Sequence, residues 1–268
     1  MAEERQPARS LVGMVHVGAL PGTPRHSMSL ERLVSQALSE TLLLVEAGFD
    51  AILLENMHDV PYLRRRAGPE VVASLTAAAC AIRREISCPL GIQILAGANR
   101  EALAVALAAE AQFIRAEGFV FAHVADEGWI ESDAGELLRY RKQIGAENIR
   151  ILADIRKKHS SHAVTQDLRL EDIAQAAEFF GADGLIVTGT ATGRPVDRGE
   201  LRRVREATTL PVLVGSGVTP ENLPQVWNYA ESFIVGSWIK RDGFWENPVD
   251  PSRARRMVET AQQLREKG

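Results

Sequence analysis

The sequence has few cysteines and no long apolar run. Its two cysteines, Cys80 on an apolar helix face and Cys88 in a loop before Pro89, form no CxxC pair, so we predict neither a thiol nucleophile nor a metal ligand. No apolar run approaches the roughly 18 residues of a membrane-spanning helix. The first ten residues, MAEERQPARS, lack the apolar stretch of a signal peptide. These features predict a cytoplasmic protein without a transmembrane segment.

The chain also lacks an excess of positive charge. Its 31 Lys and Arg against 35 Asp and Glu give a net charge of −4, which argues against binding to nucleic acid or to an anionic membrane. The 268 residues are close to the roughly 250 of a single barrel domain. Because no linker or low-complexity tract interrupts them, we predict one domain over residues 1–268, with residues 1–10 as a flexible tail.

Short apolar runs alternate with amphipathic helical segments along the whole chain. The runs are continuous rather than alternating, which is typical of parallel strands buried on both faces. No G-x-G-x-x-G motif follows the first run, so a (β/α)₈ TIM barrel is favoured over an open doubly wound sheet. The fourth strand is ambiguous, since residues 119–123 could replace residues 112–117. The predicted strands are residues 11–17, 50–54, 89–95, 112–117, 149–154, 184–188, 212–214 and 233–235.

The helical segments separate these strands one by one. Helix punctuation supports several of them, for example Pro69 at a first turn and Gly48 after a last one. After the seventh strand, Thr219-Pro220-Glu221 predicts the start of a short helix. The other predicted helices are residues 30–47, 69–86, 99–109, 136–144, 170–180, 198–207 and 252–267.

Glycine–serine pairs follow the last two strands directly. Glycine lets backbone N–H groups approach an anion closely, and a following helix N-terminus adds its positive dipole end. In barrels the last two units commonly form a phosphate site in this way. The alternative is that the glycines only turn the chain. We predict a barrel of the phosphate-binding type, with the phosphate on Gly215, Ser216, Gly217, Gly236 and Ser237.

Polar residues stand at the carboxyl ends of the predicted strands, where barrel enzymes carry their chemistry. Carboxylates there can act as general acid and base, and Lys158 or Arg115 can neutralise a developing anion. The alternative is a self-satisfied set of ion pairs, such as Arg115 with Glu55 or Glu117. The predicted catalytic residues are Glu55, Arg115, Glu117, Asp126, Asp154, Lys158 and His159. The predicted substrate-binding residues are His16, Asn56, Gln93, Thr188, Gly189, Thr192 and Gly193.

Three narrower hypotheses concern the same strand ends. Lys157 or Lys158 could form a Schiff base, although a KK pair is more often solvated charge. The sequence does not identify a cofactor. Four side chains rich in oxygen ligands would suit Mg²⁺ or Mn²⁺, but their spacing is not that of a known metal site. Residues 188–193, TGTATG, could form a second backbone cradle or a flexible loop. The residues of the metal hypothesis are Glu55, His58, Asp126 and Asp154.

With these residues in view, the chain resembles the BtpA family throughout its length. The resemblance implies a phosphate-binding barrel and a family named for a role in accumulating photosystem I. Residues 157–162, KKHSSH, depart from the family's pattern, which leaves the roles of Lys157 and His162 open. The matching stretches are MVHVGALPG at 14–22, LENMHD at 54–59, FIR at 113–115, ADI at 153–155 with KH at 158–159, IVTG at 186–189 with TG at 192–193, and VGSGVT at 214–219.

Two functions are compatible with this pattern. The first is an isomerase, lyase or transferase that acts on a small phosphorylated sugar or nucleotide-like metabolite, as a monomer or a homo-oligomer. The second is a non-catalytic biogenesis or assembly factor of the photosystem I type, which uses the barrel as a binding platform. The convergent acids, and the lack of a large apolar or basic surface signal in the sequence, favour the enzyme.

Overall fold

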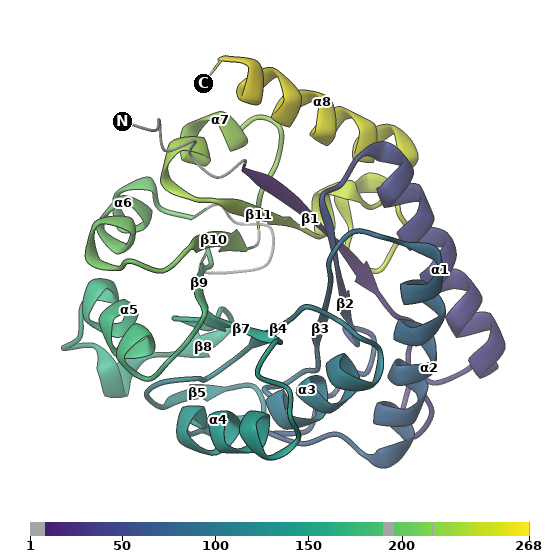
Figure 1. The fold of residues 1–268 in the computed structure, drawn as a ribbon, viewed down its shortest axis with the longest axis horizontal. Helices are drawn as coiled ribbons and strands as arrows, with labels where there is room; N and C mark the ends of the chain where they lie inside the picture. Colours follow the sequence, from purple (N-terminus) through teal and green to yellow (C-terminus); the bar gives the residue numbers. More distant parts are fainter. Residues whose placement is uncertain (1–8, 190–195, 216, 268) are drawn as a thin grey trace.

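Eight parallel strands pair side by side and close into a barrel in the computed structural model, which describes residues 9–189, 196–215 and 217–267. The order around the barrel is β1-β11-β10-β9-β7-β4-β3-β2, so nearly every strand lies beside its neighbours in sequence (Figure 1). The strands are β1 (Ser10–His16), β2 (Ala51–Glu55), β3 (Leu90–Gln93), β4 (Phe113–Ala116), β7 (Arg150–Asp154), β9 (Gly184–Val187), β10 (Val212–Gly215) and β11 (Ser232–Val235). The predicted TIM barrel is confirmed, and β4 decides the ambiguity in favour of residues 112–117.

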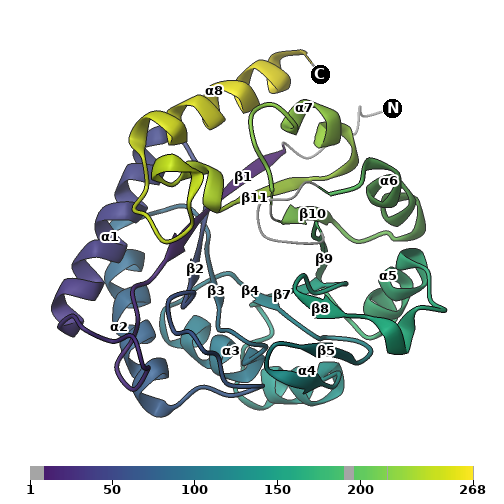
Figure 2. The ribbon, with the colours of Figure 1, turned by 180° about the vertical axis from the view of Figure 1, so that it is seen from behind.

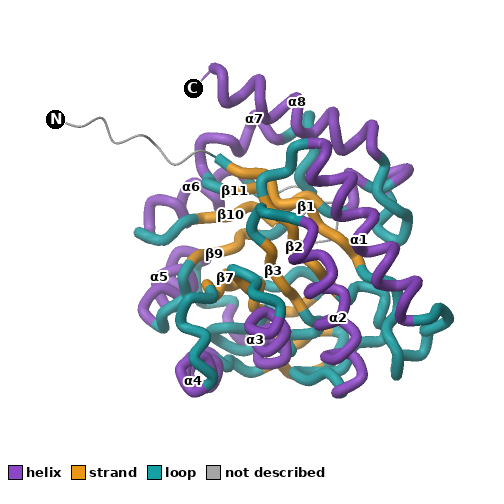
Figure 3. Tube along the Cα trace, turned by 45° about the vertical axis from the view of Figure 1, so that its right-hand side comes forward, coloured by secondary structure: helices purple, strands orange, loops and turns teal. Residues whose placement is uncertain are grey.

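Helices surround the strands on the outside, as the tube in Figure 3 shows. Short 3₁₀ helices, η1 (Ala163–Thr165), η2 (Trp227–Tyr229), η3 (Ser237–Ile239) and η4 (Arg241–Gly243), lie in the connections. The last helix packs against the first, which completes the ring seen from behind in Figure 2. The α-helices are α1 (Leu30–Ala47), α2 (Pro69–Glu85), α3 (Asn99–Ala108), α4 (Ala134–Gln143), α5 (Leu170–Phe179), α6 (Arg198–Ala207), α7 (Leu223–Val226) and α8 (Pro251–Lys267).

Alternate residues of the strands fill the inside of the barrel. They come from every strand except β3, where Gly91 leaves room for the Phe113 ring; a Cβ at Gly91 would lie 2.1 Å from Phe113 Cε2. Because side chains alternate along a strand, the residue two positions further on also points inward. The carboxyl end of the barrel is therefore lined by the residues that stand two positions after this inner set. The inner set consists of Val12, Met14, Ala51, Leu53, Phe113, Leu152, Ile186, Leu213 and Ile234.

Two local features differ from the sequence predictions. The long connections after β4 and β7 contain a small antiparallel sheet of β5 (His123–Ala125), β6 (Gly128–Ile130) and β8 (Ser160–Ser161), too short to show a hydrophobic period. The helix after β10 begins at Leu223 and not at Pro220. Thr219 and Asn222 first close a turn, in which the Thr219 amide donates to Asn222 Oδ1 at 2.9 Å.

The connection between β11 and α8 is fixed to α1 by a buried ion pair. The side chain of Lys240 is 1% exposed, and its Nζ lies 2.6 Å from Glu40 Oε2. Glu40 Oε1 also accepts a hydrogen bond from the Val249 amide at 3.3 Å. Lys240 and Val249 form an antiparallel bridge at the base of this connection. The pair therefore holds the segment that covers one side of the barrel mouth.

We expect Glu40→Gln to cost about 3–5 kcal/mol of unfolding free energy, because it leaves the buried Lys240 ammonium without a counter-charge. Lys240→Met should cost less, since the side chain of Glu40 is 18% exposed and can reach water. The double variant should be more stable than Glu40→Gln alone. Urea unfolding of the four proteins measures the coupling. Purely additive losses would show that the ion pair does not hold this connection.

Candidate active site at the carboxyl ends of the strands

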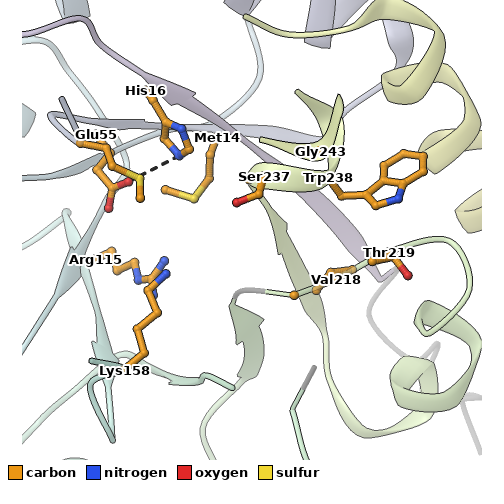
Figure 4. A pocket seen from close by; sticks show the side chains of 13 residues that line it. Met14, His16, Glu55, Arg115, Lys158, Val218, Thr219, Ser237, Trp238 and Gly243 are labelled. Atoms are coloured by element: carbon orange, nitrogen blue, oxygen red, sulfur yellow. Dashed lines mark ion pairs between the residues drawn. The ribbon is translucent and has the colours of Figure 1, made fainter. Parts of the chain in front are cut away.

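A cavity of about 130 Å³, partly open to solvent, lies at the carboxyl ends of the strands. Figure 4 shows Glu55, Arg115 and Lys158 on one side of it and Ser237 and Val218 on the other. The cavity thus joins the predicted acid–base residues to the loops after β10 and β11. Its wall is formed by Met14, His16, Glu55, Met57, Arg115, Lys158, Gly217, Val218, Thr219, Gly236, Ser237, Trp238 and Gly243.

Arg115 and Asp154 form a buried, bidentate ion pair at the bottom of this region. Arg115 Nε lies 3.2 Å from both Asp154 oxygens, and Nη2 lies 3.0 Å from Oδ2. Their side chains are only 3% and 2% exposed. The fork geometry uses both carboxylate oxygens, so Asp154 is occupied by its partner. Arg115 therefore pairs with Asp154, and not with Glu55 or Glu117 as the sequence suggested.

Glu55 and His16 lie side by side in register on β2 and β1. Glu55 Oε2 is 3.6 Å from His16 Nε2, and the carbonyl of Trp245 lies 3.1 Å from His16 Nδ1. Burial lowers the pKa of His16 well below 6.5, so the ring is neutral. A carbonyl can only accept, so Nδ1 carries the proton and the bare Nε2 faces Glu55. Burial raises the pKa of Glu55 to about 7, against the opposing charges of Arg115 and Lys158.

Glu117 and Gln93, at the carboxyl ends of β4 and β3, form a second cluster outside the cavity wall. Gln93 Nε2 donates to Glu117 Oε1 at 3.4 Å, and Lys157 Nζ lies 3.4 Å from Glu117 Oε2. The same ammonium is 3.1 Å from Glu127 Oε2. Burial opposes the charge of Lys157, but the two carboxylates outweigh it and raise its pKa. Neither Glu117 nor Gln93 is part of the cavity wall, and Lys157 is the charge that balances this cluster.

Two predicted substrate-binding side chains hold loops together. Asn56 Nδ2 donates to Asp59 Oδ2 at 2.8 Å, and its Oδ1 accepts from the Leu95 amide at 2.8 Å. Thr188 Oγ1 donates to the carbonyl of Arg156 at 2.8 Å. Both side chains therefore already have partners inside the protein.

Two predicted catalytic residues lie away from the cavity. Asp126 is exposed in the turn between β5 and β6, and His159 is exposed with a φ of 54° in the loop after β7. Gly189 is buried just after β9. Thr192, Gly193 and Ser216, which were also predicted to bind ligand, lie outside the described residues.

The glycines of the predicted phosphate loops have different surroundings. Gly215 ends β10 and is packed, since a Cβ there would lie 2.8 Å from Ile186 Cγ2. Gly217 lines the cavity with a φ of 68°, a conformation that favours glycine. Gly236 and Ser237 line the cavity from the end of β11. Because the following α7 has only four residues and starts at Leu223, this end of the cavity offers an anion backbone amides rather than a helix dipole.

Sequence reasoning missed two residues that shape the site. Arg65 donates to the carbonyls of Gly97, Glu117 and Gly118 at 3.2, 3.0 and 2.6 Å, and so ties together the loops after β3 and β4. In the sequence it stands in an RRR run, which is typical of solvated charge. Trp245 acts on His16 through its backbone carbonyl, a contact that no residue type encodes.

The hypothesis of a Mg²⁺ or Mn²⁺ site finds no ligand set in the described ranges. Within residues 9–189, 196–215 and 217–267, no three His, Cys, Asp or Glu side chains are grouped so that they could hold a metal ion. In the same ranges no helix is long and apolar enough to cross a membrane.

Comparisons with known proteins agree with the fold. The model of the BtpA family matches residues 7–263. A Caenorhabditis elegans protein described as uncharacterized and mitochondrial is 46% identical over 264 residues, which cover 96% of this chain and 95% of that protein. The photosystem I biogenesis protein BtpA of Synechocystis is 33% identical over 250 residues, which cover 93% of this chain and 86% of that protein.

Two solved structures share the architecture at low identity. Thiamine phosphate pyrophosphorylase from Pyrococcus furiosus superposes with a TM-score of 0.60 at 15% identity, covering 96% of this chain and 98% of the other. (S)-3-O-geranylgeranylglyceryl phosphate synthase from Thermoplasma acidophilum, in complex with sn-glycerol-1-phosphate, gives 0.61 at 17% identity, covering 96% and 94%. At such identities the likeness concerns the fold alone.

The contrast between Glu55 and Asp154 gives a stability test. At neutral pH, Asp154→Asn should cost about 3–5 kcal/mol, because it leaves the buried Arg115 guanidinium unpaired. Glu55→Gln should instead stabilise the fold at pH 8. Burial holds the pKa of Glu55 at about 7 against an ordinary 4.5, a difference worth about 3 kcal/mol.

The raised pKa of Glu55 determines the pH range over which this residue lowers the stability of the fold. Between about pH 4.5 and 7 the unfolded chain releases this proton while the folded chain keeps it, so stability falls as the pH rises. The advantage of Glu55→Gln over wild type should thus be absent below pH 4.5 and complete above pH 7. Urea unfolding at pH 4.5, 6 and 8 measures it. A pH-independent difference would contradict the assignment of this pKa to Glu55.

Proposed function

This chain belongs to the BtpA family, and on that premise we propose that it is an enzyme acting on a small phosphorylated sugar or nucleotide-like metabolite. One observation carries the proposal: a single cavity joins glycine-rich backbone at the ends of β10 and β11 to an acid–base group on β2. The resemblance of the fold to enzymes whose names include phosphorylated compounds supports the same reading.

The phosphate would lie on the β10 and β11 side of the cavity. The amides of Gly217, Val218, Gly236 and Ser237 lie there, and the hydroxyl of Ser237 adds a donor. The reacting atoms would then lie on the opposite side, facing Glu55. This arrangement suits a substrate of a few carbon atoms with one terminal phosphate, because the cavity of about 130 Å³ is small and partly open to solvent.

Glu55 would move the proton during the reaction. With a pKa of about 7 it is present in both protonation states near neutral pH, which suits a general acid or base. The bare Nε2 of neutral His16 faces its carboxyl group and orients it. Arg115, held by Asp154, supplies a fixed positive charge for an oxyanion that develops nearby. Isomerases, lyases and transferases that act beside a carbonyl group share this need.

The alternative is a biogenesis or assembly factor, as the name of the Synechocystis relative suggests for that protein. Placing Glu55 and Lys158 around one cavity, away from most of the solvent, lowers the stability of the fold. A non-catalytic binding protein would gain nothing from this loss of stability. We therefore favour the enzyme. For the compartment we propose the cytoplasm, although the Caenorhabditis elegans relative is named as mitochondrial.

Ser237 provides the test of the phosphate site. A phosphorylated ligand at about 100 times its Kd stabilises the fold by roughly 2.7 kcal/mol. For a chain of this length that raises Tm by roughly 5–10 °C. Ser237→Asp should abolish the rise, because its carboxylate repels the anion, whereas the similarly sized but neutral Ser237→Asn should keep most of it. Ser237 suits this test better than Gly217, whose positive φ makes any side chain there strained.

The measurement is a thermal-shift screen of triose, pentose and hexose phosphates against the three proteins, with the unphosphorylated compounds as controls. We expect at least one sugar phosphate to raise Tm only when it carries its phosphate group and only when residue 237 is neutral. A ligand that stabilises wild type and Ser237→Asp equally would place the phosphate elsewhere.

A further inference from the structure

Two lysines that are neighbours in the sequence have opposite surroundings. Lys157 is held between Glu117 and Glu127, at 3.4 and 3.1 Å from their carboxylates. Lys158 instead lines the cavity, and its Nζ makes no hydrogen bond or ion pair with any of the residues that the structure describes. The first is a structural charge, whereas the second is an amine that faces the substrate space.

The groups around Lys158 explain why it has no ion-pair partner among the described residues. The nearby Asp154 is paired with Arg115, and its charge raises the pKa of Lys158 less than burial and Arg115 lower it. Glu55 lies on the same side of the cavity, where its own burial favours the protonated form. Burial, and then the positive charge of Arg115, lower the pKa of Lys158. A lysine that is desolvated beside another cation is the setting in which the free amine becomes a nucleophile.

We propose that Lys158 forms an imine with the carbonyl carbon of a phosphorylated aldehyde or ketone. The inference rests on the proposed function for the phosphate site only, and it adds the substrate class and the covalent step. The geometry supports it, because Lys158 and Glu55 lie across the cavity from Ser237 and Val218 (Figure 4). A phosphate held by the loops after β10 and β11 would direct the carbonyl end toward the amine.

The step balances with the groups that are present. The lone pair of Nζ forms a C–N bond with the carbonyl carbon, and the C=O π pair moves to oxygen, which takes a proton from the Glu55 carboxyl. The nitrogen loses a proton to the Glu55 carboxylate, which returns one to the new hydroxyl as it leaves as water. The nitrogen lone pair then forms the C=N bond, and the iminium nitrogen gives its remaining proton to the Glu55 carboxylate, which leaves a neutral imine. The net reaction is amine plus carbonyl compound to imine plus water, and Glu55 ends as it began.

Reductive trapping tests this step on the intact protein. The probe is glyceraldehyde 3-phosphate with cyanoborohydride, a reductant that delivers hydride to the imine carbon. Trapping adds the mass of the aldehyde less one oxygen atom to the lysine, and peptide fragmentation identifies which lysine carries it. Lys157, one residue away, serves as the internal control. Burial and Arg115 lower the pKa of Lys158, whereas two carboxylates raise that of Lys157, so we expect the label on Lys158 and little on Lys157.

Two further arms make the result specific. Unphosphorylated glyceraldehyde at the same concentration should label Lys158 far less, and so should glyceraldehyde 3-phosphate with Ser237→Asp. Lys158→Met should remove the single major label without moving it to another lysine. If that variant does not fold, the peptide map of the wild-type protein still identifies which lysine carries the label.

The outcomes separate this inference from the proposed function. Label spread over surface lysines, or placed on Lys157, would overturn the imine. If glyceraldehyde 3-phosphate raises Tm but leaves Lys158 unlabelled, the phosphate site stands and the imine falls. If Lys158 is labelled equally by both aldehydes and in Ser237→Asp, the reactive amine stands and the phosphate site falls.

Discussion

The ion pair between Arg115 and Asp154 is the interaction on which the rest of the site depends. It places one permanent positive charge inside the barrel mouth and offsets much of the negative charge of Asp154 there. Among the described residues, the half-buried Lys158 forms no ion pair, and the buried Glu55 has the neutral His16 ring at 3.6 Å. Burial therefore governs their protonation, raising the pKa of the acid to about 7 and lowering that of the amine. The pKa values of the acid and the amine are thus both moved toward neutral pH, beside a guanidinium group that stays charged.

Much of this site could be predicted from the sequence, because side chains alternate with period two along a strand. His16, Glu55, Arg115 and Asp154 each stand two residues after an apolar residue of the barrel interior, namely Met14, Leu53, Phe113 and Leu152. Continuous apolar runs similarly predicted the strands and their order. The boundaries of α1 and α6 were predicted to the residue, because capping residues and glycine mark them.

Other parts depend on tertiary contacts that no local pattern carries. Asn56 ends a strand as a catalytic residue would, yet Asp59 and the Leu95 amide occupy its side chain. Asp126 follows β4 in the chain, but the small sheet of β5, β6 and β8 turns it outward into solvent. The partner of Arg115 and the different surroundings of Lys157 and Lys158 require the closed barrel, since their acids come from other strands.

We propose that the cavity has an anion-binding end at the loops after β10 and β11 and a reacting end at Glu55, Arg115 and Lys158. Arg115 and Lys158 are also the cavity's charged donors, so they are the competing position for a phosphate. A crystal grown with tungstate, a heavy tetrahedral oxyanion, would distinguish the two positions by anomalous scattering. We expect the anomalous peak of tungstate within hydrogen-bonding distance of the amides around Gly217 and Ser237. A peak on Arg115 and Lys158, with none at those amides, would contradict it.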